Sequence, residues 1–195
     1  MGTALILQRG FDKVSISEIA EAANVSRMTV FNYFPRKEDI FFDRRDEISE
    51  LLRTAIRDRP RNATPLVAVR ALVLRLLSSG HPFMAVTPSV RHFWLIVENS
   101  EALRKHAGEM LDQLETALAG MLAEAVDAPA HDPMARIAAG MIGTVHRVTY
   151  REGLRRVREG EAVETVRRKQ RELVQKGFDM LEAAFAHTPY GRARR

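Results

Sequence analysis

Cysteine is absent from the 195 residues of this chain. Disulfide bonds, thiolate metal sites and a cysteine nucleophile are therefore excluded, and the composition fits a reducing compartment. Long apolar runs are lacking too, because charged or polar residues interrupt every stretch well before the ~20 residues that a membrane span needs. The first residues show no basic segment followed by a cleavage-like site, so we expect no signal peptide, no membrane partner and a cytoplasmic location.

Sequence motifs of the common enzyme classes are missing as well. We find no glycine-rich phosphate loop, no nucleophile elbow and no zinc-binding His-Glu-x-x-His. His92 and His106 have neither a clustered carboxylate nor a helical histidine partner nearby, so we expect no metal site and no other cofactor. An enzyme remains the alternative from another class, and a turnover assay with candidate substrates would reveal it.

Charge is present in both signs, with no strong excess of either. The chain has 30 Lys and Arg against 25 Asp and Glu, a net charge of +5. Residues 1–37 carry five basic and three acidic side chains, whereas residues 151–195 carry twelve basic and seven acidic ones. A modest positive charge permits binding to a polyanion without identifying one, so charge alone does not predict the function.

Apolar residues are plentiful, at 46% of the chain, and they recur at helical spacing almost throughout. No segment alternates in the way that a half-buried strand requires, so the pattern predicts an all-α protein of about nine helices. Glycine, proline and asparagine separate the apolar segments from one another. The composition is sufficient for a packed core and argues against global disorder.

Two short helices are predicted one after the other near the N-terminus. The sequence Ser15-x-x-Glu18 is a capping box, in which each side chain accepts a hydrogen bond from the other residue's backbone amide. Val14 and Ile19 are spaced as a hydrophobic staple around this helix start. Asn24 tolerates the left-handed conformation that ends a helix, so the first helix is expected to be short.

The second helix begins directly afterwards. Ser26 is its predicted N-cap, Val25 and Val30 are spaced as the staple pair, and Pro35 cannot continue the helix. Two helices of about two turns each, joined by a turn of about four residues, have the proportions of a helix-turn-helix.

The helix pair divides into an apolar and a polar face. We expect an inward set made of Ile16, Ile19, Ala20, Ala23, Val25, Val30 and Phe34. The outward face of the second helix then carries Arg27, Met28, Thr29, Asn32 and Tyr33. Such groups suit a DNA major groove, because Arg pairs with guanine, Asn with adenine and Met with the thymine methyl, while hydroxyls bind phosphates. The alternative is an ordinary solvated face of a small helix pair.

The sequence from Gly10 to Ile40 closely resembles the signature of the tetracycline-repressor (TetR) family. The shared pattern is a glycine-aromatic break, an Ile-Ala pair, a Val-Ser turn, a hydroxyl-apolar-aromatic run and a Phe followed by Lys-Glu and an apolar residue. In this chain these are Gly10-Phe11, Ile19-Ala20, Val25-Ser26, Thr29-Val30-Phe31, Phe34, Lys37-Glu38 and Ile40. The match covers about the first quarter of the chain.

The resemblance implies a domain organisation and a function. A three-helix DNA-binding domain is expected at residues 1–38, a regulatory ligand-binding and dimerisation domain at 39–187, and a flexible basic tail at 188–195. The protein would be a transcriptional regulator that acts as a repressor. It would bind a palindromic operator on double-stranded DNA as a homodimer. A small hydrophobic or aromatic effector would release it.

The resemblance also implies roles for single residues. Arg27, Met28 and Asn32 would contact bases, and Ser15, Thr29, Tyr33 and Lys37 would bind phosphates, with Ser17 and Phe31 completing the DNA-contacting set. Phe31 stands where the family usually has Tyr, so it cannot supply a hydroxyl to a phosphate. Arg36 stands at a position that a capping residue often occupies.

A basic N-terminal arm and the front of the first helix, both usual in the family, are not present before Ala4. We therefore expect a late start site, omitted residues or a reduced affinity for DNA. A helical adaptor that no longer binds DNA is the alternative that this departure suggests.

In the regulatory domain, the residues expected near a ligand pocket are Met84, His92, Phe93, Trp94, Val97, His106, Met110, Leu114, His146 and Tyr150. Plain core is the alternative for each of them, because apolar residues at helical spacing are more often core than pocket lining. The residues expected at a four-helix dimer interface are Met141, Val145, Phe178, Leu181 and Phe185. The alternative for these is the core of a monomer.

Overall fold

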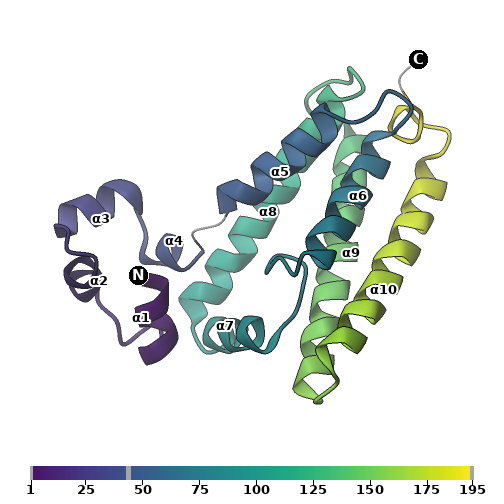
Figure 1. The fold of residues 1–195 in the computed structure, drawn as a ribbon. Coiled ribbons are helices and arrows are strands. Elements are labelled where there is room, and N and C mark those ends of the chain that lie inside the picture. The colour runs from purple at the N-terminus through teal and green to yellow at the C-terminus, as the bar shows by residue number, and fades with distance from the viewer. Residues whose placement is uncertain (1, 43–44, 194–195) are drawn as a thin grey trace. The chain divides into compact units, whose positions relative to one another are not determined.

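The computed structural model describes residues 2–42 and 45–193, and all regular secondary structure within these ranges is helical. The all-α prediction is confirmed, with ten α-helices and one 3-10 turn among the described residues. They are α1 (Gly2–Arg9), α2 (Ile16–Ala22), α3 (Arg27–Tyr33), α4 (Lys37–Phe41), α5 (Arg45–Arg57), α6 (Pro65–Ser78), α7 (Pro88–Glu98), α8 (Glu101–Glu124), α9 (Pro133–Arg158), α10 (Val163–Phe185) and η1 (Pro189–Gly191) (Figure 1). None of these helices has the length and apolar character to cross a bilayer.

The chain forms two compact units, which are described separately. Unit 1 comprises Met1–Asp46 and Ser89–Met110, and unit 2 comprises Glu47–Pro88 and Leu111–Arg195. These boundaries differ from the expected division after residue 38, because α7 and the first half of α8 share a core with the N-terminal helices. In that core the rings of Phe41 and Phe93 stack with their centroids 4.3 Å apart.

Unit 2 is a helical bundle in which α9 and α10 run side by side, with α10 also packed on α6 (Figure 1). Close approach of α9 and α10 depends on Gly177, where an added Cβ would lie 2.7 Å from Cγ2 of Val145. Phe178, Leu181 and Phe185 of α10 lie in the buried core of this unit.

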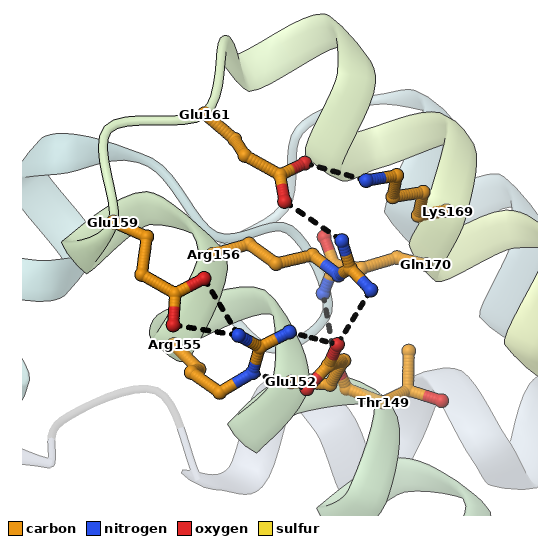
Figure 2. A network of polar contacts seen from close by, with 8 residues as sticks. All are labelled: Thr149, Glu152, Arg155, Arg156, Glu159, Glu161, Lys169 and Gln170. Atoms are coloured by element: carbon orange, nitrogen blue, oxygen red, sulfur yellow. Dashed lines mark hydrogen bonds and ion pairs between the residues drawn. The ribbon is translucent and has the colours of Figure 1, made fainter.

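A polar network joins the end of α9 to the start of α10 (Figure 2). The carboxylate of Glu152 accepts hydrogen bonds from Arg155 at 2.7 and 2.8 Å and lies 2.7 Å from the guanidinium of Arg156. Glu161 in turn accepts from Arg156 at 2.7 Å and from Lys169 at 2.8 Å. The bonds from Arg155 are the main cause that lowers the pKa of Glu152 to about 2.

The C-terminal segment is more ordered than expected. Tyr190, in η1, is buried, packs edge-on against Phe185 and donates a hydrogen bond from its hydroxyl to Asp132, the N-cap of α9. The expected loose tail therefore does not begin at Thr188, because a buried aromatic ring anchors the chain two residues later. The last two residues of the expected tail lie outside the described ranges.

Candidate nucleic-acid interface

Local capping fixes the ends of α2 and α3, as the sequence predicted. The backbone amide of Ser15 donates to Glu18 Oε2 at 2.8 Å, and the amide of Glu18 donates to Ser15 Oγ at 3.2 Å. At the start of α3 the amide of Thr29 donates to Ser26 Oγ at 3.0 Å. Asn24 adopts a φ of 54° at the turn, the left-handed conformation expected there. The capping residues therefore build the predicted helix-turn-helix.

The outward face of α3 is open to solvent. Met28 is 69% exposed and Tyr33 is 77% exposed, while Arg27, Phe31 and Asn32 are exposed as well. Within the described part of the chain, Arg27 and Asn32 form no hydrogen bond or ion pair. An exposed cation, amide and apolar surface on one short helix leaves several groups able to meet base edges.

The remaining predicted contact residues are more constrained. The hydroxyl of Thr29 is already 2.8 Å from Ser26 Oγ, and Ser15 is engaged in its capping box. Ser17 lies exposed on the first turn of α2. Val25 was expected to face inward, but it is 42% exposed, so that assignment was wrong. Of the expected staple pair, Val30 is buried, whereas Val25 is exposed at the turn between α2 and α3.

Lys37, the first residue of α4, is held within unit 1. Its Nζ donates to the backbone carbonyl of Phe11 at 2.5 Å and lies 4.1 Å from the centroid of the Phe11 ring. Partial burial lowers the pKa of Lys37, and nearby carboxylates, Asp12 first, oppose that shift. An ammonium group has three donors, so this bond leaves others for a phosphate.

Helix α8 supplies contacts to α4 that the sequence analysis missed. Arg36 makes no side-chain cap, and its guanidinium instead donates to Glu109 Oε2 at 2.9 Å. The backbone amide of Arg36 is capped by Asp39, which also lies 3.1 Å from Nε2 of the buried His106. His106 and Glu109 therefore hold the first turn of α4, which follows α3 directly in the chain. No local signal marks these pairs, because about 70 residues separate their members.

The residues expected to line one pocket are divided between the two units. His92, Phe93, Trp94, Val97, His106 and Met110 belong to unit 1, and Met84, Leu114, His146 and Tyr150 to unit 2. Phe93, Trp94 and Val97 pack in or against the core of unit 1, and His106 pairs with Asp39. Helical periodicity does not show which core a residue joins, so the grouping of these ten residues around one pocket stays a prediction.

A small cavity lies inside unit 2. Its volume is about 60 Å³, and α5, α6, α8 and α9 contribute to its wall together with Phe83. Leu114 and His146 are the only two of the ten expected pocket residues that line it, among the residues that the structure describes. Most of the other lining side chains are apolar. Among the described residues, no group of three or more potential metal ligands comes together.

Three of the five expected dimer residues are instead core residues. Phe178, Leu181 and Phe185 are at most 2% exposed within a single chain, so no second copy can contact them. Met141 and Val145 are partly buried against the same core, and Val145 packs on Gly177. The apolar face of α10 thus serves its own chain, which is the alternative that the sequence left open.

Comparisons with known proteins agree with this helix-turn-helix. Residues 2–43 match the model of the family described as bacterial regulatory proteins, tetR family. The nucleoid occlusion factor SlmA of Haemophilus ducreyi (strain 35000HP / ATCC 700724) is 28% identical over 117 residues, which make up 59% of this chain and 57% of that protein. The chain thus spans little more than half the length of this curated relative.

The capped helix pair places the chain in the class of helix-turn-helix DNA-binding proteins. The matched family narrows the class further: residues 2–43 resemble the helix-turn-helix segment of bacterial regulatory proteins of the tetR family. The family is one of regulatory proteins, which fits the expectation that the chain is not an enzyme.

Proposed function

We propose that this protein is a cytoplasmic repressor that binds a palindromic operator as a homodimer and leaves it when a small hydrophobic effector binds. The observation that carries the proposal is the outward face of α3. Its cation, amide and apolar groups are exposed together, although apolar side chains of this size are normally buried. A DNA major groove offers groups complementary to this surface.

Single roles follow from this geometry. Arg27 and Asn32 contact base edges, and Met28 contacts thymine methyl groups. Tyr33, Thr29, Ser15 and Lys37 bind phosphates, because hydroxyl and ammonium groups position a protein on the DNA backbone without selecting its sequence. Ser17 lies near enough to the start of α2 to join the phosphate contacts, and Phe31 contributes an apolar contact in place of a hydroxyl.

Dimerisation is supported by a different surface from the one that the sequence suggested. Along α9, Met134, Ile137 and Val148 are exposed apolar side chains at helical spacing, and Ile137 is 51% exposed. On α10, Met180 is 73% exposed. We define these four residues as the outer stripe. A second copy that packs its own outer stripe against this one would remove the exposed apolar area from water.

Effector control is supported by the cavity in unit 2 and by helix α8. The helix carries Leu111, Leu114, Glu115 and Leu118 on the cavity wall, and His106 and Glu109 in the contacts to α4. A ligand shifts an equilibrium only through its different affinity for two states, so the effector must bind best when α4 is placed wrongly for the operator. An aromatic effector, the other class expected from the sequence, would require this cavity to enlarge.

The test is DNA binding by α3 variants on an operator fragment selected from genomic DNA. Arg27→Ala and Asn32→Ala should each weaken specific binding by about 1–3 kcal/mol, because each removes a base contact. Binding to random DNA should change much less. Arg158→Ala, which removes an exposed cation of unit 2, is the matched control and should bind normally. If the α3 variants bound like the control, the adaptor alternative would replace this proposal.

A further inference from the structure

Three charged or titratable side chains gather on the wall of the unit 2 cavity, and all the others that line it are apolar or glycine. Glu115 comes from α8, and His146 and Arg147 are neighbours on α9. The apolar part of the wall includes Val69 and Val73. A cavity with an apolar body and a few convergent polar groups is the usual form of a small-molecule site.

The ion pair between Arg147 and Glu115 is longer than usual. Nη1 of Arg147 lies 3.4 Å from Oε2 of Glu115, whereas charge-assisted hydrogen bonds are usually about 2.7–2.9 Å long. Nη2 of Arg147 donates to Thr144 Oγ1 at 3.0 Å, which anchors the guanidinium to its own helix. Because a guanidinium has five donors, most of the hydrogen-bonding capacity of Arg147 is unused within the described residues.

Glu115 lacks such an anchor. Its carboxylate lies against two glycines of α9, so that a Cβ added at Gly143 would be 2.8 Å from Oε2 and one at Gly140 would be 3.2 Å from Oε1. Apart from Arg147, Glu115 has no hydrogen-bonding or ionic partner in the part of the chain that the structure describes. About a third of its side chain is exposed. The Arg147 side chain is exposed to a similar extent, at 37% against 34% for Glu115. It is therefore the bond to Thr144, and not burial, that holds Arg147 in place while Glu115 can turn to solvent.

His146 adds no second positive charge. Its Nε2 donates to the carbonyl of Phe83 at 2.8 Å, and its ring stacks on the Phe83 ring with centroids 4.3 Å apart. Burial is the main cause that lowers the pKa of His146, so the ring is neutral at pH 7. The charge at this wall is then set by Arg147 and Glu115 alone.

The size of the cavity limits the ligand further. Its volume of about 60 Å³ is well below the ~150 Å³ of a cavity that holds benzene. There is room among its apolar side chains for a few aliphatic carbon atoms, and the charged end of a ligand would lie at the partly exposed edge formed by Arg147 and Glu115. We propose that this cavity binds a short-chain aliphatic carboxylate, whose chain lies among Val69, Val73 and their neighbours and whose carboxylate replaces Glu115 as the partner of Arg147. The inference deepens the proposed effector control and rests on it only for the consequence on DNA.

A cationic ligand fits the same wall less well. An ammonium group next to Glu115 would face the anchored guanidinium of Arg147, and like charges at close range repel. A carboxylate meets that guanidinium in the bidentate geometry that arginine favours, and the displaced Glu115 side chain can move into solvent.

The test uses isobutyrate as the probe, with isobutyramide and isobutylamine as neutral and cationic molecules of nearly the same size. Binding to the full chain is measured by titration calorimetry in the absence of DNA. Isobutyrate should bind at least about tenfold more tightly than either analogue, because only the carboxylate gains the charged hydrogen bonds. Preferential binding of the amine, equal binding of all three probes, or no binding would each overturn the proposal.

Two variants test the site itself, because they should change the affinity for isobutyrate in opposite directions. Arg147→Gln should weaken isobutyrate binding by at least about tenfold, since it removes the charged donor. Glu115→Gln should strengthen it by at least about threefold, since it removes the competing anion. A folding defect cannot tighten binding, so the second variant separates the site from damage to the fold. Arg151→Gln, an exposed cation on α9, is the control, and an equal loss in this variant would contradict a specific role for Arg147.

Release of DNA is measured separately, with an operator fragment and isobutyrate. If isobutyrate binds with the expected variant pattern and DNA is not released, the ligand class stands and the proposed effector control fails. If DNA is bound and released by other compounds while isobutyrate fails in calorimetry, the ligand class is wrong and the proposed function stands.

Discussion

The guanidinium of Arg36 donates a hydrogen bond to the carboxylate of Glu109 at 2.9 Å, which joins two residues 73 positions apart. Arg36 is the residue that departs from the capping residue often found at this point in the family. The structure explains the departure, because Asp39 caps the helix through the Arg36 backbone and leaves the guanidinium free to bind α8. The resulting contact ties α4 to α8 within unit 1.

We expect this pair to contribute modestly to operator binding through the placement of α4. Arg36→Gln and Glu109→Gln should each weaken binding by no more than about fivefold, because exposed ion pairs are weak. The double variant should bind like either single variant, since both remove the same contact. Fluorescence anisotropy with labelled operator measures these affinities at low and high salt. Fully additive losses that persist at high salt would indicate that the two residues act independently, against this account.

Alanine substitutions at two glycines should have opposite effects on stability, because only Gly177 lies where α9 and α10 pack closely. Gly177→Ala should destabilise the protein by about 1–3 kcal/mol, because the new methyl group would overlap the side chain of Val145. Gly120→Ala on α8 meets no atom within 4 Å and should stabilise it by up to about 1 kcal/mol through helix propensity. Urea unfolding followed by circular dichroism measures both. Equal effects of the two substitutions would show that this close approach is not formed.

The network around Glu152 predicts a defined pH dependence. Its folded pKa of about 2 lies below the ordinary value of 4.5, so its contribution to stability is fully present above pH 4.5 and is lost as the pH falls toward 2. Wild type should exceed Glu152→Gln in unfolding free energy by a constant amount from pH 8 to about pH 5, and the difference should shrink below that. Denaturant unfolding at several pH values measures this. A constant difference down to pH 3 would contradict the assigned pKa.

The outer stripe predicts which substitutions separate a dimer. Ile137→Glu and Met180→Glu should each shift the protein toward monomer, because a buried, unpaired carboxylate at an interface is costly. Val67→Glu is the matched control, since Val67 is also an exposed apolar residue but lies on α6. Analytical ultracentrifugation gives the masses. A dimer that survives both stripe variants, or one that Val67→Glu disrupts equally, would place the interface elsewhere.

Local signals in the sequence were sufficient to predict the helix-turn-helix. The hydroxyl caps at Ser15 and Ser26 and the left-handed turn at Asn24 are interactions between residues close in sequence, and all three are present in the structure. The all-helical class followed from periodicity for a similar reason, because helical hydrogen bonds join near neighbours.

Long-range partners could not be predicted in this way. Periodicity identified the apolar face of Phe178, Leu181 and Phe185 but not whether the same chain or a second copy covers it. His106 was assigned to a pocket. Its partner Asp39 lies 67 positions earlier, so nothing near His106 in the sequence reveals the contact between them. Gly140 and Gly143 of α9 accommodate the carboxylate of Glu115 from α8, and no pattern within α9 alone reveals that contact. Each of these assignments depends on which element, distant in the sequence, packs against the residue in question.

The central claim is that the exposed face of α3 selects a DNA sequence. Selection of genomic fragments by the purified protein, followed by footprinting at several salt concentrations, tests it most directly. We expect enrichment of one inverted repeat whose half-sites lie about one helical turn apart, with an affinity that falls steeply as salt rises. Weak binding without sequence preference, unchanged when Arg27 and Asn32 are both replaced by alanine, would contradict the claim.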